Sequence, residues 1–167
     1  MTENRRFVAI LMGSHSDLPT MQSTASVLDS FNIPYEMNIK SAHRTPAETQ
    51  DYVVDAEKRG CVVFIAAAGL AAHLAGAVSA LTVRPVIGVP MEGGPLQGVD
   101  ALLSTVQMPG GISVACTAIG TAGAKNAGYL AAQILSLYDE GLAQALRDER
   151  LANAAKILEK DAELRRG

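Results

Sequence analysis

The sequence has 167 residues, of which 49% are hydrophobic, 19% charged and only 4% aromatic, which fits one domain with a substantial core and excludes a disordered or fibrous chain. A formal net charge of -3 without an extended basic segment argues against nucleic-acid binding. The 27 alanines and 15 glycines predict a core in which backbones approach closely.

Strands and helices are expected to alternate along the chain. Phe7–Met12 is a continuous apolar run ended by Gly13, as in a strand buried on both faces. Thr45–Glu48 has the pattern of a capping box with proline at the first helical position, and this helix is expected to close at Arg59 and Gly60. The other elements expected up to residue 60 are a helix at 18–31 and a strand at 35–39.

The second half of the sequence continues this alternation. The patterns predict strands at 61–67, 86–89 and 112–119, and helices at 71–81, 99–106, 122–138 and 140–165. Five strands alternating with helices, without repeats, indicate a doubly wound α/β domain around a parallel sheet. We expect a single domain over 1–167, with its core at about 7–138 and a charged helical extension at about 139–167.

The cysteines and the apolar segments bear on the compartment. Cys61 and Cys116 lie in apolar runs without metal-ligand spacing and are expected to be buried thiols in a reducing, cytoplasmic environment. The apolar stretch of Phe7–Met12 is too short for a secretory signal. Phe64–Leu81 is long enough to raise the possibility of a membrane span, but its small residues and Gly69 favour a strand that runs into a helix.

The loop after the first predicted strand offers polar groups at a helix start. In α/β sheets ligands bind beyond the carboxyl ends of the strands. Ser14 and Ser16 place hydroxyls beside free N–H groups, which suits an anion, and Asp17 could accept hydrogen bonds from ribose hydroxyls. The same residues could instead form an ordinary N-cap cluster.

The loops after the second and third predicted strands contain the other two histidines. Ser41, His43 and Arg44 precede the best-marked helix, where Arg44 could bind phosphate and His43 could exchange a proton near neutral pH. Alternatively, Arg44 pairs with a surface acid and His43 caps a strand. His73 begins an alanine-rich helix, where a ligand role competes with that of a hydrogen-bonded core histidine.

Several kinds of site are disfavoured by missing motifs. No phosphate-binding Gly-Lys-Ser/Thr or Gly-x-Gly-x-x-Gly pattern occurs, and no Gly-x-Ser-x-Gly elbow of a serine hydrolase. Three histidines and Asp17 could in principle hold zinc, but no His-x-x-His or His-Glu-x-x-His spacing supports it. We therefore expect no metal site.

Four segments together resemble the PurE family of de novo purine synthesis. They are Met-Gly-Ser-His-Ser-Asp at 12–17, Ser-Ala-His-Arg-Thr-Pro at 41–46, Gly-Leu-Ala-Ala-His-Leu at 69–74 and Val-Gln-Met-Pro-Gly-Gly at 106–111. The resemblance covers about residues 7–138. Arg44 and Pro46 resemble the bacterial mutase class rather than the animal-type carboxylases, which tend to carry lysine in place of the arginine.

The resemblance implies an isomerase that moves a carboxyl group of N5-carboxyaminoimidazole ribonucleotide from the exocyclic nitrogen to ring carbon C4, without a metal or a cofactor. It implies a flavodoxin-like or Rossmann-like three-layer α/β/α fold with a C-terminal helical tail, assembled as a homo-octamer. The roles it implies are general acid/base for His43; contact with the 5′-phosphate for Ser14, Ser41 and Arg44; support of the first loop for Ser16; ribose binding for Asp17; and substrate contact or loop ordering for His73.

The third loop departs from the family pattern Gly-Gly-Ala-Ala-His-Leu-Pro-Gly at Leu70 and Ala75. We expect these changes to affect the shape of the pocket and the mobility of the loop more than the type of reaction. Two alternatives stay open. The chain could carboxylate aminoimidazole ribonucleotide directly with carbon dioxide or bicarbonate, or it could be a non-catalytic ribonucleotide-binding relative.

Overall fold

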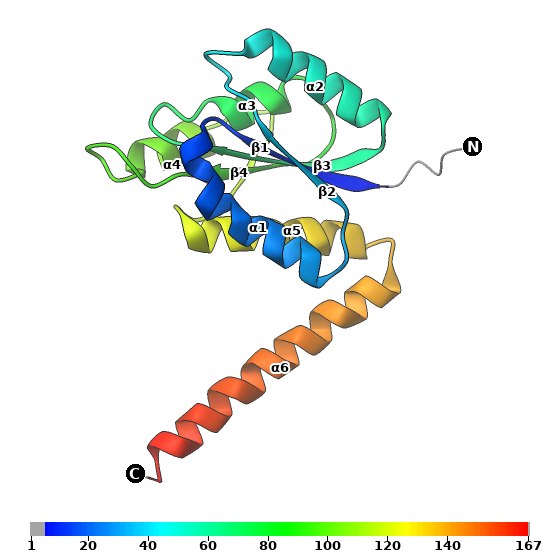
Figure 1. Cartoon of the computed structure of the whole chain (residues 1–167), viewed down its shortest axis with the longest axis vertical. Helices are drawn as coiled ribbons and strands as arrows, with labels where there is room; N and C mark the ends of the chain where they lie inside the picture. Colours follow the sequence, from blue (N-terminus) through cyan, green and yellow to red (C-terminus); the bar gives the residue numbers. More distant parts are fainter. Residues whose placement is uncertain (1–5, 167) are drawn as a thin grey trace. The chain divides into compact units, whose positions relative to one another are not determined.

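The computed structural model describes residues 6–166 and contains a five-stranded sheet in which all neighbouring strands run parallel (Figure 1). The strands are β1 (Phe7–Met12), β2 (Tyr35–Ile39), β3 (Cys61–Ala68), β4 (Val86–Pro90) and β5 (Ala115–Cys116). Their order is β2-β1-β3-β4-β5, which is the flavodoxin-like order and confirms the predicted fold class. The strand order reverses between β1 and β3, so ligands are expected above these two strands.

Seven helices accompany the sheet within the described residues. They are the 3₁₀ helix η1 (His15–Asp17) and the α-helices α1 (Leu18–Ser30), α2 (Pro46–Lys58), α3 (Leu74–Ser79), α4 (Val99–Val106), α5 (Thr121–Ser136) and α6 (Glu140–Leu164). The chain divides into two compact units that meet at Ala131/Ala132 within α5, and the single domain expected over 1–167 stays a prediction. None of the helices in residues 6–166 is long and apolar enough to cross a membrane.

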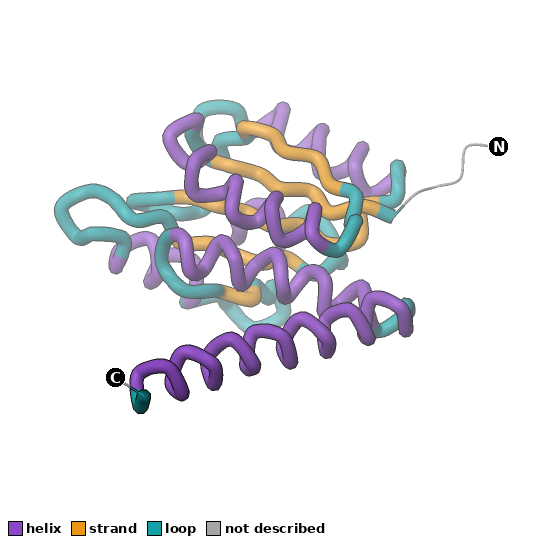
Figure 2. The backbone as a smooth tube through the Cα atoms, turned by 60° about the horizontal axis from the view of Figure 1, so that its bottom comes forward, coloured by secondary structure: helices purple, strands orange, loops and turns teal. Residues whose placement is uncertain are grey.

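Helices cover both faces of the sheet (Figure 2). On one face, α2 and α3 bury side chains such as Val53 and Val78 against Phe64 of β3. On the opposite face, α1 and the first turns of α5 lie side by side (Figure 1), and the Thr24 hydroxyl donates a 2.7 Å hydrogen bond to the Ala124 carbonyl. The three-layer arrangement thus follows from strands that are apolar on both faces.

The small residues of the core allow close packing, as their number predicted. A Cβ added to Gly88 in β4 would lie 2.3 Å from Cγ2 of Thr105 in α4 and 3.3 Å from Cβ of Ala75 in α3. A side chain at residue 88 would therefore push both helices away from the sheet.

Two predicted elements are shorter than expected. The strand expected at 112–119 is reduced to Ala115–Cys116, because it pairs only with β4 at the sheet edge, through Ile87 and Gly88. The helix expected at 71–81 begins only at Leu74, after a loop in which Leu70 has a φ of +55°. Continuous apolar runs predicted both segments but did not mark where regular structure ends.

Two local expectations were wrong. Thr45 caps α2 without a side-chain cap hydrogen bond, because its hydroxyl accepts from the Ser41 N–H at 2.9 Å and donates to the Ser41 carbonyl at 3.2 Å. Cys61 is buried as expected, and burial raises the pKa of its thiol to about 12. Cys116 is only half-buried, because it lies on the short edge strand.

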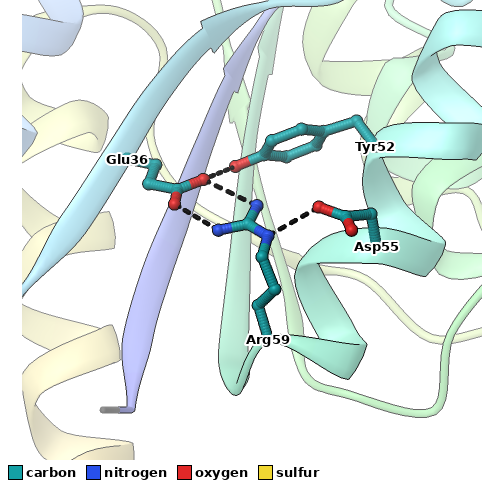
Figure 3. Close-up of polar contacts among 4 residues, drawn as sticks. All are labelled: Glu36, Tyr52, Asp55 and Arg59. Carbon is teal, nitrogen blue, oxygen red and sulfur yellow. Dashed lines mark hydrogen bonds and ion pairs between the residues drawn. The ribbon is translucent and has the colours of Figure 1, made fainter. Parts of the chain in front are cut away.

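A cluster of charged and phenolic groups joins the edge strand β2 to α2. Figure 3 shows the Arg59 guanidinium between two carboxylates: Nη1 lies 2.5 Å from Oε1 of Glu36, and Nε lies 2.6 Å from Oδ2 of Asp55. The Tyr52 hydroxyl donates to Oε2 of Glu36 at 2.8 Å. The hydrogen bond from Arg59 is the main reason that the pKa of Glu36 falls below its usual value.

Candidate active site

A cavity of about 630 Å³ lies at the carboxyl ends of β1 to β4, which includes the point where the strand order reverses. It is formed by the loops that follow these four strands. All seven residues predicted from the sequence line it: Ser14, Ser16, Asp17, Ser41, His43, Arg44 and His73. The structure therefore brings together side chains from three separate loops.

The first loop is a tightly bonded N-cap. Oγ of Ser14 accepts the Ser16 N–H at 3.3 Å and the Ser16 hydroxyl at 2.9 Å, while Oδ2 of Asp17 accepts the Ser14 N–H at 3.1 Å. The N-cap interpretation of these residues is thus confirmed. Because the same groups line the cavity, capping and ligand contact are compatible here.

Asp17 is a buried carboxyl at the wall of the cavity, with 8% of its surface exposed. Burial raises the pKa of Asp17, although hydrogen bonds from Ser14 and Ser16 and the charge of Arg44 act in the opposite direction. Additional hydrogen-bond donors from a ligand would therefore stabilise the ionised carboxylate.

Arg44 ties the second loop to the first. Its Nη2 donates to the Gly13 carbonyl at 2.7 Å, and its Nε donates to Oγ of Ser41 at 3.4 Å. The backbone N–H of Arg44 also donates to Oγ of Ser41, at 3.1 Å. These bonds hold an exposed guanidinium beside the Ser41 hydroxyl, in the cavity that Ser14 also lines, which is a suitable arrangement for a phosphate.

His43 and His73 form a direct pair across the cavity wall. Nε2 of His43 lies 2.8 Å from Nδ1 of His73, and the two rings meet edge to face with centroids 4.9 Å apart. One nitrogen must donate and the other accept, so the tautomer of one ring fixes that of the other. Both side chains are exposed, and His73 is therefore not a buried core histidine.

The fourth loop was missed as a part of the site. Met91, Glu92, Gly93 and Gly94 follow β4 and line the cavity, although their sequence predicts no role for them. They could have been found by applying the strand-end rule to β4 as well as to the first three strands. In residues 6–166, no three His, Cys, Asp or Glu side chains are grouped in a way that could hold a metal ion.

The topology and this cavity define a flavodoxin-like α/β protein with a small-molecule site where the strand order reverses, between β1 and β3. The chain belongs to the AIR carboxylase family, whose model matches residues 7–156. The family predicted from the four sequence segments is thereby confirmed.

Curated relatives and solved structures agree with this assignment. The chain is 52% identical over 157 residues to N5-carboxyaminoimidazole ribonucleotide mutase of Bacillus subtilis, covering 94% of this chain and 97% of the relative. It is 50% identical over 152 residues to the protein of the same name from Escherichia coli, covering 91% and 90%. The crystal structure of Treponema denticola PurE superposes with a TM-score of 0.86 at 36% identity, covering 96% and 99% of the two chains.

Proposed function

We propose that this protein is an N5-carboxyaminoimidazole ribonucleotide mutase of purine biosynthesis, which produces 4-carboxy-5-aminoimidazole ribonucleotide. The observation that carries the proposal is the His43–His73 pair, held in one cavity with a guanidinium and a buried carboxylate. The names of relatives about 50% identical over nearly the whole chain support the same activity. In this proposal, Ser14, Ser41 and Arg44 bind the 5′-phosphate of the ribonucleotide, and Asp17 binds its ribose hydroxyls.

In the proposed reaction, His43 both gives and takes one proton. It donates a proton to the exocyclic nitrogen as the N–C bond breaks, which releases carbon dioxide and leaves aminoimidazole ribonucleotide. C4 then attacks the carbon dioxide, a C–C bond forms, and His43 takes the proton that C4 loses. His73 holds the ring of His43 and its tautomer through the 2.8 Å contact, and Ser16 supports the first loop through Ser14. No cofactor takes part in these steps.

The experiment is turnover of purified protein with N5-carboxyaminoimidazole ribonucleotide, and separately with aminoimidazole ribonucleotide plus carbon dioxide. His43→Asn should lower kcat by about 10²- to 10⁴-fold while ribonucleotide binding persists. Full turnover by this variant would contradict the role of His43. Binding without turnover in the wild type would favour a non-catalytic relative.

The description of the matching family favours a second candidate, direct carboxylation of aminoimidazole ribonucleotide. The same two assays distinguish it, because activity with free carbon dioxide at low concentration would contradict the mutase assignment.

We also propose that the protein is a cytoplasmic homo-octamer. One side of α4 supports self-association: Val99, Leu103 and Val106 follow at helical spacing and are 49%, 52% and 46% exposed. Two free cysteines fit a reducing compartment. Light scattering of the purified protein tests the assembly, and a monomer at micromolar concentration would contradict it.

A further inference from the structure

Leu70 holds a backbone conformation that leucine rarely adopts. Its φ of +55° lies in the left-handed region that favours glycine. The side chain is 54% exposed, so burial in the core does not compensate for this conformation. The residue lies between β3 and α3 and lines the cavity. A strained residue beside a site points to a function for its side chain there.

The side chain of Leu70 meets the backbone of the loop that follows β4. A Cβ added to Gly94 would lie 2.4 Å from Cδ2 of Leu70, and among the described residues the atoms within 4 Å of that position, chain neighbours aside, belong to Leu70. Gly94 itself has a φ of +66°. Leu70 therefore occupies the space that a side chain at position 94 would take, and one leucine and one glycine join the two loops.

The loop after β4 is bonded to β3 at its start, where the Met91 N–H donates to the Ala68 carbonyl at 2.9 Å, and further along it has bonds within itself. The Gln97 N–H donates to the Gly94 carbonyl and the Gly98 N–H donates to the Gly93 carbonyl, both at 3.2 Å. A Cβ added to Gly93 would meet no described atom within 4 Å. Leu70 thus supplies packing between the Gly93–Gly94 segment and the neighbouring wall of the cavity.

We propose that Leu70 is a positioning residue for the mutase reaction: its side chain holds the Gly93–Gly94 segment beside the cavity and so retains the released carbon dioxide. This proposal rests on the proposed function. Breaking the N–C bond gives aminoimidazole ribonucleotide and carbon dioxide, and product forms only when C4 attacks that carbon dioxide and loses its proton. Carbon dioxide that escapes leaves aminoimidazole ribonucleotide behind, so the share of substrate ending as this compound measures retention.

Leu70→Gly is the first test, because glycine adopts a φ of +55° without strain and the variant should unfold at the same temperature as the wild type or higher. The share ending as aminoimidazole ribonucleotide should rise roughly three- to tenfold, with KM changed less than about twofold. The matched control is Leu96→Ala, which truncates a 58% exposed leucine outside the cavity lining and should leave the share unchanged.

The partner residue provides a second test. Gly94→Ala places a methyl group where Cδ2 of Leu70 lies and also introduces strain at a φ of +66°, and should raise the same share by separating the segment from the leucine. Leu70→Ala and the double variant Leu70→Ala/Gly94→Ala complete the cycle. In the double variant the smaller side chain leaves room for the added methyl, so the rise should be smaller than the sum of the rises in Leu70→Ala and Gly94→Ala. Strictly additive effects would contradict contact between the two positions.

Hydrogen exchange gives a measurement that does not depend on activity. Amides of residues 92–97 should exchange faster in Leu70→Gly than in the wild type, because the segment loses its packing. If wild-type protein fails to turn over the mutase substrate, the proposed function is wrong, while this comparison still tests the contact. Unchanged exchange, or an unchanged share of aminoimidazole ribonucleotide in Leu70→Gly, would overturn the proposal.

Discussion

At the scale of single residues, the site uses side chains that also hold its own loops in place. Ser14 caps η1, Ser41 accepts two bonds from Arg44, and Asp17 accepts a backbone N–H. A ligand would therefore meet groups that are already oriented, which lowers the entropy lost on binding. The same bonds give each substitution in the site two measurable effects, one on stability and one on binding.

Asp17→Asn separates these two effects. Because the pKa of Asp17 is raised in the folded protein, the ionised carboxylate opposes folding above that pKa, and this penalty disappears as the pH falls toward the unfolded value. Asparagine keeps an acceptor for the Ser14 N–H without the charge. We expect the unfolding temperature at pH 7 to stay equal or rise, with the difference from the wild type shrinking at lower pH.

Binding should respond in the opposite direction. Loss of the charged acceptor in Asp17→Asn should raise KM for the ribonucleotide about tenfold or more. Steady-state kinetics and thermal unfolding measured on the same sample check both effects. A large fall in the unfolding temperature at pH 7 would contradict the first expectation, and an unchanged KM the second.

At the scale of elements, the sequence predicted some boundaries well and others poorly for identifiable reasons. The predicted boundaries of β1, Phe7–Met12, match the structure at both ends, because a strand buried on both faces is continuously apolar and Gly13 ends it. The boundaries predicted for α3 and the fifth strand were wrong. The alanine-rich run before α3 has no residue that marks the start of the helix at Leu74, and the apolar run of the fifth strand has none that marks its end at Cys116. The first three loops of the site were predictable, since each combines polar residues with the end of a predicted strand.

Other features could not be derived from a single sequence. The contact between His43 and His73 joins positions 30 residues apart, and its geometry depends on how β2 and β3 are placed beside β1. The packing of Leu70 on Gly94 likewise depends on β3 and β4 being neighbours. Neither pair has a periodicity that local patterns could reveal.

Gly88→Ala tests the packing of α3 and α4 on the sheet. The added Cβ would lie 2.3 Å from Cγ2 of Thr105, and overpacking of this kind costs about 1–3 kcal/mol. Thermal or denaturant unfolding should show this loss at fixed protein concentration. Gly110→Ala is the matched control, because a Cβ there meets no described atom within 4 Å and its stability should stay near that of the wild type.

Glu36→Gln tests the cluster between β2 and α2. The pKa of Glu36 is lowered by its hydrogen bond with Arg59, so the ionised form stabilises the fold above the unfolded pKa, and this contribution is lost as the pH falls through the folded value. Because both side chains are more than a third exposed, we expect a loss of only about 0.5–1 kcal/mol at pH 7.

The difference between Glu36→Gln and the wild type should begin to shrink as the pH falls to the ordinary glutamate pKa of about 4.3, and should vanish only below the lowered folded pKa of Glu36. Denaturant unfolding as a function of pH measures it, with Asp51→Asn as a control for loss of an exposed carboxylate on α2. A difference that persists undiminished at low pH would show that the ion pair is not its cause.

At the scale of the whole molecule, the alanine-rich segment around α3 bears on assembly. Ala80 ends this helix with an exposed side chain and Ala77 is half-buried, which suits a close approach by another subunit. Leucine at either position should disturb the proposed octamer. Light scattering should show a lower average mass for Ala77→Leu and Ala80→Leu, and an intact octamer from both variants would count against this interface.

The cluster around Arg59 has a consequence for the chain in concentrated solution. β2 pairs with β1 on one side only, so its other side is an open edge that a strand from another molecule could extend. Glu36 lies within this strand, and its carboxylate is held by a guanidinium and a phenol (Figure 3). We expect a charged side chain on this edge strand to make pairing with a further strand unfavourable, so the Glu36 carboxylate should help to keep the open edge from aggregating.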